Sequence, residues 1–239
     1  MPIIVQLVLI GMIGYLWGSI PAGYWMGKLI KGKDFDIRAY GSHKIGMTNV
    51  LRTLGRGPAL IVLIFDLMKG FGPTLIATLV PFFYGTGWGY GWGPTVAGLA
   101  ALIGHIYPIF IGFKGGRGVL TGAGALLVIS PLTFLISLIV LAITILTSRY
   151  VSLGSILGSL ATIICGIVFY FIGSLNPEFF GKVSLAQLVF MLIGPAIIII
   201  VHYDNIGRLL SGTERKLGQK VVLEEGTSPT NSSSSNAKA

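Results

Sequence analysis

The chain has 239 residues, of which 53% are hydrophobic and only 10% are charged, and its mean hydropathy is +0.84. Soluble domains contain about 25% charged residues, so the composition excludes a soluble globular protein and indicates one integral membrane domain. The formal net charge of +9 does not point to nucleic acid, because the basic residues stand between apolar segments and form no polar face.

Seven apolar segments are candidates to cross a bilayer, whose hydrocarbon core takes roughly 20 helical residues. They are, approximately, residues 3–25, 57–80, 94–111, 118–130, 131–147, 153–173 and 186–203. The fourth and fifth are short, and only Ser130 and Pro131 separate them. The alternative is therefore a five-span protein in which 118–147 forms one long kinked helix plus an interfacial piece.

The basic residues favour seven spans over five. Fifteen of the seventeen follow the first, third, fifth and seventh spans, so seven spans place all fifteen on one side. The opposite side then has an uncharged loop, 81–93, and Lys182. Loops rich in Lys and Arg stay cytoplasmic. We expect an all-α membrane protein of about seven helices, with its N-terminus outside and its C-terminus and active site at the cytoplasmic face.

The first predicted cytoplasmic loop, RAYGSHKIGMTNVLRTLGRG (38–57), is rich in glycine and in short polar side chains. Ser42, Thr48, Asn49 and Arg52 could donate hydrogen bonds to an oxyanion. Thr48 or Asn49 could equally be the N-cap of a helix that leads into the second span.

The second loop, GFKGGRGV (112–119), combines two cations with closely spaced glycines. Lys114 and Arg117 provide charge, and a helix that begins at about Val119 would add the positive end of its dipole. The glycines would let backbone N–H groups converge on an anion: Gly115, Gly116 and Gly118. This pattern predicts a phosphate site. The alternative is a simple turn whose two cations only anchor the topology.

The other two loops also carry groups that could contact an anion. TSRYVSLGS has Arg149, Ser152 and Ser155 close together. VHYDNIGRLL has polar residues at intervals of three, which share one face of a helix: His202, Asn205 and Arg208. A single histidine near a helix end is more often a hydrogen-bonded bystander, but its polar neighbours favour a functional role.

Ionisable residues also lie within the second and third spans. Asp66 and Lys69 are three residues apart, and charges at that depth are costly unless they are functional or paired. They could simply neutralise each other. His105 lies in the third span, near its predicted cytoplasmic end.

Six sequence blocks carry a resemblance to a known family. They are, in chain order, GSHKIGMTNVLR (41–52), DLMKG (66–70), GHIYPIF (104–110), FKGGRG (113–118), SRYVSL (148–153) and HYDNIGRLLSGTE (202–214). In this order, and at these loops and helix ends, they resemble the bacterial membrane glycerol-3-phosphate acyltransferase family, PlsY. The resemblance runs from about residue 11 to 217.

The resemblance implies a multi-pass enzyme of the bacterial inner membrane that carries out the first step of phospholipid synthesis. It would transfer a fatty acyl group from acyl-phosphate to the 1-position of sn-glycerol 3-phosphate, giving lysophosphatidate and inorganic phosphate. No cofactor or metal is expected. The implied partners are these two substrates and the bilayer, and the enzyme that produces acyl-phosphate is a candidate protein partner.

Together, the residues and the resemblance predict two sets of site residues. The catalytic set is Ser42, Arg52, His202 and Asn205. The substrate-binding set is Thr48, Asn49, Lys69, His105, Lys114, Gly115, Gly116, Arg117, Gly118, Ser152 and Arg208.

The chain departs from the usual family pattern at three positions. The family usually reads GSGNIGATN, so His43 and Lys44 replace a glycine and an asparagine, and their roles are open. Arg117 replaces the commoner lysine, which keeps the charge but changes its geometry.

No acid follows any of the three histidines in the H-x-x-x-x-D pattern of other glycerolipid acyltransferases. We therefore expect the glycerol hydroxyl to attack the acyl group directly, with the substrate's phosphate or His202 taking the proton. The alternative function is a small-anion or lipid transporter, against which the absence of an internal sequence repeat argues. Residues 1–220 should form one domain, and the polar, serine-rich residues 221–239 a disordered tail.

Overall fold

The computed structural model describes residues 2–84, 91–175 and 182–219, and these ranges contain helices and no strand. The expected all-α fold is confirmed for this part of the chain. The predicted polar tail, 221–239, lies outside the described residues.

Seven helices correspond to the seven predicted apolar segments. They are α1 (Ile3–Gly18), α4 (Arg56–Leu79), α6 (Trp92–Ile106), α7 (Val119–Ile129), α8 (Pro131–Ser148), α9 (Val151–Leu175) and α11 (Leu185–Ile200). The shorter elements connect them or extend them: α2 (Ala22–Lys31), η1 (Ile37–Ala39), α3 (Met47–Thr53), α5 (Pro81–Tyr84), η3 (Ile109–Ile111) and α12 (Tyr203–Leu210).

Five helical stretches among the described residues are long and apolar enough to cross a membrane. They contain α1 with α2, α4, α6 with η3, α8, and α9. A sixth results if α11 and α12, which meet at a bend of 57°, count as one broken span. α7 has 11 residues, or about 16 Å of helix, and is shorter than the hydrocarbon core of about 30 Å.

Prolines explain two breaks in the helices. α7 ends at Ile129 and α8 begins at Pro131, which confirms the predicted joint and excludes one long helix over 118–147. Proline suits a first helical position, where no N–H is needed. The expected first span to residue 25 is wrong in one respect. α1 ends at Gly18 and α2 starts after Pro21, because proline disfavours helix in the residue before it.

Glycines bring the helices of the first half into close contact. A methyl group at Gly14 or Gly18 of α1 would overlap the backbone of α6, at Gly18 the carbonyl oxygen of Ala101. A methyl group at Gly70 of α4 would likewise overlap the carbonyl oxygen of Thr121 on α7. Small residues of this kind allow close helix packing in membranes, where association depends on van der Waals contact.

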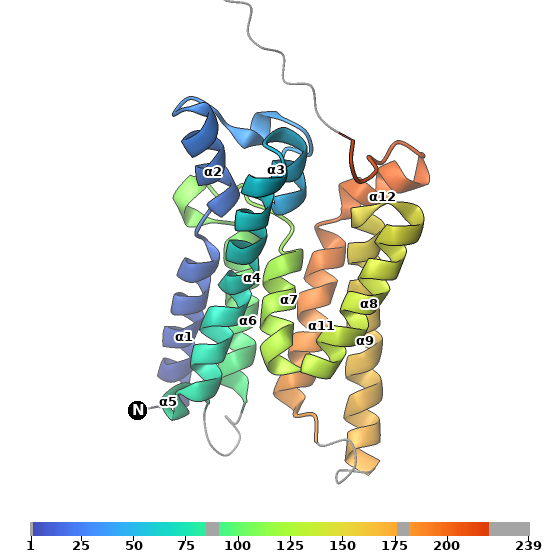
Figure 1. Cartoon of the computed structure of the whole chain (residues 1–239). Helices are drawn as coiled ribbons and strands as arrows, with labels where there is room; N and C mark the ends of the chain where they lie inside the picture. The colour runs from blue at the N-terminus through green and yellow to red at the C-terminus, as the bar shows by residue number, and fades with distance from the viewer. Residues whose placement is uncertain (1, 85–90, 176–181, 220–239) are drawn as a thin grey trace, which may run out of the picture.

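The polar elements gather at one end of the bundle. Figure 1 shows α2, α3 and α12 at this end, and the start of α1 together with α5 at the other. Large apolar side chains are exposed on the outside of the helices between the two ends, such as Leu60 of α4 and Leu146 of α8. An apolar outer surface is the expected consequence of contact with lipid.

Candidate active site

A cavity of about 190 Å³ lies among the polar elements. Its walls come from all four predicted cytoplasmic loops, from Asp66 within α4, and from parts of α6 and α8. The polar residues that line it are Ser42, Lys44, Thr48, Asn49, Arg52, Asp66, His105, Arg117, Ser152, Ser155, His202, Asn205 and Glu214. The fold therefore brings together residues that are far apart in the sequence, up to 172 positions for Ser42 and Glu214.

Asn49 shapes the first loop from inside. Its side chain is buried, and its Oδ1 accepts the backbone N–H of Ser42 at 3.0 Å. Its Nδ2 donates to the carbonyl oxygens of Ile37, Tyr40 and Lys44 at 3.2, 3.1 and 2.8 Å. An amide group has two N–H donors and one carbonyl, so these bonds occupy it. Asn49 borders the cavity, but its hydrogen bonds go to the backbone of the loop and not to a substrate.

The N-cap of α3 is Gly46, and no side chain caps this helix. The alternative in which Thr48 or Asn49 is the N-cap is therefore wrong. Thr48 and Ser42 both border the cavity, and within the described part of the chain neither hydroxyl makes a hydrogen bond. Both are available to a ligand.

Two arginines reach the cavity, one from α3 and one from the loop before α7. Arg52 is partly buried, its Nη2 donates to the carbonyl oxygen of Arg215 at 3.2 Å, and burial lowers its pKa. The Nε of Arg117 is buried without a hydrogen-bond partner among the described residues. Burial, followed by repulsion from Arg208, lowers the pKa of Arg117 to about 10. The Arg117 guanidinium is therefore still charged at neutral pH.

The glycine loop does not form the predicted cradle of backbone donors. The N–H groups of Gly115 and Gly116 donate to the carbonyl oxygens of Ile106 and His105, both at 3.1 Å. A methyl group at Gly115 would overlap the His105 carbonyl, and one at Gly116 would overlap the His105 ring. These glycines therefore allow the loop to lie against the end of α6. Lys114 is exposed and does not border the cavity.

The predicted start of a helix at about Val119 is confirmed by α7. Gly118 adopts a left-handed conformation with φ 76° and precedes Val119, the first helical residue. Gly118, Val119 and Leu120 all border the cavity. The first N–H groups of a helix have no partner within it, and its dipole makes this end positive. The cavity therefore has a positive helix end in its wall.

Glu214 links α9 to α12. Its Oε1 accepts from Ser152 Oγ at 2.8 Å and from Asn205 Nδ2 at 2.7 Å, and its Oε2 accepts from Arg208 Nε at 2.7 Å. Burial opposes ionisation of this carboxyl group, but the three hydrogen bonds outweigh it and lower the pKa of Glu214. Glu214 was not among the predicted site residues. Its only sequence signal was its place in the GTE block of the family resemblance.

His202 lies at the bend between α11 and α12, as the N-cap residue of α12. It is buried and borders the cavity, and its Nδ1 lies 2.7 Å from the carbonyl oxygen of Ile198. A carbonyl oxygen can only accept, so Nδ1 carries the hydrogen and donates it. In the neutral ring this leaves Nε2 as the nitrogen that can accept a proton.

Asp66 and Lys69 form the predicted ion pair. Both are buried, and Lys69 Nζ lies 2.6 Å from Asp66 Oδ1. His105 Nδ1 is 3.5 Å from Lys69 Nζ and 3.7 Å from Asp66 Oδ1. Asp66 and His105 border the cavity, but Lys69 does not. The geometry therefore favours the interpretation that Asp66 and Lys69 neutralise each other, with the His105 ring beside the ion pair.

The cavity contains ten of the fifteen predicted site residues. The five that do not border it are Lys69, Lys114, Gly115, Gly116 and Arg208. Of these, Lys69 and Arg208 neutralise the two acids of the cavity wall, and the two glycines support the loop. The sets missed Lys44, Asp66, Ser155 and Glu214, which also border the cavity.

Known proteins resemble this chain over most of its length. A family model described as glycerol-3-phosphate acyltransferase matches residues 8–212. Glycerol-3-phosphate acyltransferase 3 of Dehalococcoides mccartyi is 40% identical over 223 residues, which cover 91% of this chain and 99% of that protein. The glycerol-3-phosphate acyltransferase of Shouchella clausii is 40% identical over 218 residues, with 91% and 98% covered.

A solved structure resembles the fold as well. The crystal structure of PlsY (YgiH), an integral membrane glycerol 3-phosphate acyltransferase, was determined in a glycerol 3-phosphate form. It is 37% identical to this chain with a TM-score of 0.74, and 89% of this chain and 96% of that chain are covered. Its lysophosphatidic acid form gives a TM-score of 0.72.

Because Glu214 accepts hydrogen bonds from Ser152, Asn205 and Arg208, removing its charge should lower the stability of the folded protein. We call these four side chains the Glu214 hub. Glu214→Gln keeps an acceptor for Ser152 and Asn205 but removes the charge that binds Arg208. Hydrogen bonds to charged groups contribute about 1.5–3 kcal/mol, so the variant should unfold at a lower temperature in detergent at pH 7. Asp34→Asn, which neutralises a carboxylate in an exposed loop, is the control.

The lowered pKa of Glu214 also fixes the direction of its pH dependence. Its stabilisation is complete above the ordinary glutamate pKa of about 4.3 and is lost as the pH falls through the lower, folded-state value. The difference in unfolding temperature between the parent protein and Glu214→Gln should therefore disappear in strong acid. An equal unfolding temperature at pH 7 would contradict the assigned role.

Proposed function

The chain belongs to the glycerol-3-phosphate acyltransferase family, and from this premise we propose that it transfers a fatty acyl group from acyl-phosphate to the 1-position of sn-glycerol 3-phosphate. The products are lysophosphatidate and inorganic phosphate. The observation that carries the proposal is a cationic cavity that shares a wall with an apolar pocket.

The cationic part suits the phosphate groups of both substrates. Arg52 and Arg117 border the cavity and take part in no ion pair within the described residues. Planar guanidinium groups bind phosphate oxygens in pairs. The positive end of α7 adds to the same field. A phosphate bound here would meet both full charges and helix N–H groups.

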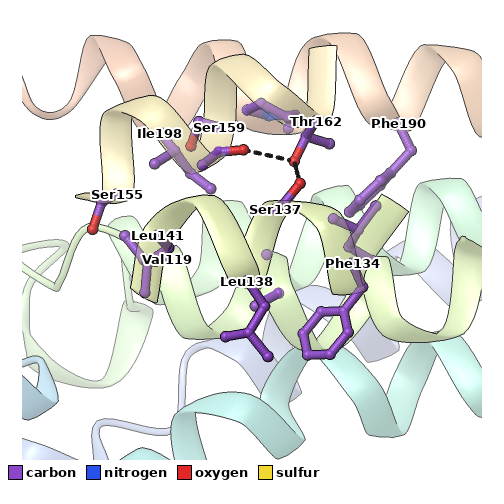
Figure 2. Close-up of a pocket in the computed structure, with 16 residues that line it drawn as sticks. Val119, Phe134, Ser137, Leu138, Leu141, Ser155, Ser159, Thr162, Phe190 and Ile198 are labelled. Carbon is purple, nitrogen blue, oxygen red and sulfur yellow. Dashed lines mark hydrogen bonds between the residues drawn. The ribbon is translucent and has the colours of Figure 1, made fainter. Parts of the chain in front are cut away.

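The apolar part suits a fatty chain. A second pocket lies between α7, α8, α9 and α11 and shares Val119, Leu141 and Ser155 with the cationic cavity. Figure 2 shows Ser155 and Leu141 at one end of it and Phe134 and Phe190 at the other. Its volume is about 70 Å³, and Phe134 and Phe190 bound its far end. Most of a long chain would therefore lie beyond it, in the bilayer.

Four hydroxyl groups line this second pocket, and three of them have hydrogen-bond partners within the protein; the fourth, on Ser159, makes no hydrogen bond among the described residues. Ser137 Oγ and Thr162 Oγ1 are 2.8 Å apart and share a hydrogen bond, and Ser155 Oγ donates to the carbonyl oxygen of Val151. Because these three hydroxyls are satisfied within the protein, an acyl chain could lie beside them without leaving them unpaired.

The chemistry we propose is direct acyl transfer. The glycerol hydroxyl oxygen bonds to the acyl carbon, and the carbon–oxygen bond to phosphate breaks, with its electron pair leaving on phosphate. The hydroxyl proton passes to His202 Nε2 or to the departing phosphate. Ser42 Oγ and the second N–H of Asn205 Nδ2 stabilise the developing oxyanion, while Arg52 holds the phosphate. Correct positioning of the two substrates contributes the rest.

We also propose that all seven helical segments cross the bilayer and that the cavity opens to the cytoplasm. The loops at its end carry most of the basic residues, which favours retention on the cytoplasmic side. α7 can be short because it packs against α4, α6, α8 and α11, so protein covers much of it in place of lipid.

The first test is the reaction itself. The purified chain in detergent, given acyl-phosphate and glycerol 3-phosphate, should release lysophosphatidate and inorganic phosphate in equal amounts. Acyl-CoA and acyl-carrier protein should give no product. Product from acyl-CoA alone would contradict the proposed donor, and transport of either substrate without product would favour the transporter.

The same assay distinguishes the two proton acceptors. If His202 takes the proton, His202→Gln should lower kcat by about 100-fold or more, since general base catalysis contributes roughly 10²–10⁴-fold. If phosphate takes the proton, the loss should be much smaller. The comparison requires that the variant unfold at the same temperature as the parent protein.

A larger side chain in the apolar pocket should affect only the acyl donor. Ala123 borders this pocket, and Ala123→Met should fill part of it and displace the chain. Losing about 60 Å² of apolar contact, at about 25 cal/mol per Å², raises KM for acyl-phosphate by about 10-fold. KM for glycerol 3-phosphate should not change. Ala142→Met, at a residue of α8 that does not border the pocket, is the control. Equal effects of both changes would contradict the proposal that the apolar pocket holds the acyl chain.

Labelling of intact cells tests the orientation. In a Cys165→Ala background, cysteine is introduced by Lys33→Cys in the loop after α2 or by Lys182→Cys before α11. A membrane-impermeant maleimide should label position 182 and leave position 33 unlabelled until the cells are lysed. The reverse pattern would place the cavity outside.

A further inference from the structure

Lys44 enters the cavity from a backbone that is held in place. Its carbonyl oxygen accepts Asn49 Nδ2 at 2.8 Å, and the same amide group accepts the N–H of Ser42. Between them, His43 adopts a left-handed conformation with φ 56°, and its Nδ1 lies 2.9 Å from the carbonyl oxygen of Arg38. The segment that carries Lys44 is therefore fixed before any ligand arrives.

The side chain of Lys44 has no partner within the described part of the chain. It borders the cavity and is partly buried, yet its ammonium group makes no hydrogen bond or ion pair there. Burial and the nearby charge of Arg117 lower the pKa of Lys44. The negative charge of Asp204 opposes this shift only in part, so the partly buried amine is still destabilised, and an anionic ligand would reverse that.

The cavity wall has more positive than negative charge, and an anionic ligand can balance the excess. Its two acids are paired with cations outside the wall: Asp66 with Lys69 at 2.6 Å and Glu214 with Arg208 at 2.7 Å. Three cations of the wall then have no ion pair among the described residues: Lys44, Arg52 and Arg117. Two phosphate groups, each with a charge of roughly −1.5 to −2, are enough to balance them.

We propose that Lys44, the third cation of the cavity wall beside Arg52 and Arg117, binds the phosphate group of glycerol 3-phosphate. This inference rests on the proposed function. The apolar pocket meets the cavity at Val119, Leu141 and Ser155, so the phosphate of the acyl donor lies on the side of α7 and α9. Lys44 comes from the loop before α3, and the second phosphate is the one within its reach. The asparagine usual at this family position has no charge to offer.

Steady-state kinetics with one substrate varied at a time tests the assignment. Lys44→Asn should raise KM for glycerol 3-phosphate by about 10- to 100-fold, the value of one charge-assisted hydrogen bond. kcat and KM for acyl-phosphate should stay within about two-fold of the parent protein's values. Lys44→Arg should restore most of the loss, and the salt dependence of KM for glycerol 3-phosphate should weaken in Lys44→Asn.

A matched control removes the same charge elsewhere. Lys31→Asn, at the exposed end of α2, should leave all three constants unchanged. A rise confined to KM for acyl-phosphate would overturn the assignment to glycerol 3-phosphate. Unchanged constants in Lys44→Asn would overturn a role in phosphate binding altogether.

A binding measurement separates this inference from the reaction. Calorimetric titration of the full chain with glycerol 3-phosphate should show the same 10- to 100-fold loss of affinity in Lys44→Asn. If the parent protein binds glycerol 3-phosphate but transfers no acyl group from any donor, the proposed reaction fails while the role of Lys44 stands. If parent and variant bind it equally, the role of Lys44 fails.

Discussion

Ionised groups that are removed from water need partners, and this requirement shapes the whole polar end of the molecule. Glu214 satisfies three side chains at once and thereby joins α9 to α12. Lys69 neutralises Asp66 in the second span. Because both acids of the cavity wall are already paired, the cations that remain are free to attract a ligand. The field of the cavity thus depends on ion pairs whose cationic members lie outside it.

Backbone packing places these charges where they can act together. Asn49 uses its amide group on the first loop, and the N–H groups of Gly115 and Gly116 bind the end of α6. Neither arrangement leaves a donor for substrate. Their effect is indirect, since they fix the two loops from which Lys44, Arg52 and Arg117 reach the cavity.

Much of the fold could be predicted from the sequence, because hydropathy and proline act locally. The apolar segments gave seven helices, and Pro131 marked the break between α7 and α8. The meeting of the four loops agrees with their predicted placement on one side of the membrane. The role of the glycines could not be predicted, because the same pattern serves anion binding and close packing. Nor could the Glu214 hub, whose bond to Ser152 joins residues 62 apart in the chain.

The wall shared by the cationic cavity and the apolar pocket has a consequence for how the substrates reach the site and how the lipid product leaves it. In the proposed reaction, one substrate arrives by three-dimensional diffusion in water and the other by two-dimensional diffusion in the membrane. The lipid product never has to cross an aqueous layer, because its tail already lies among other tails when the new ester bond forms. Its departure is then a lateral movement through the leaflet. Turnover would accordingly respond to the viscosity of the bilayer, a property that soluble enzymes do not sense.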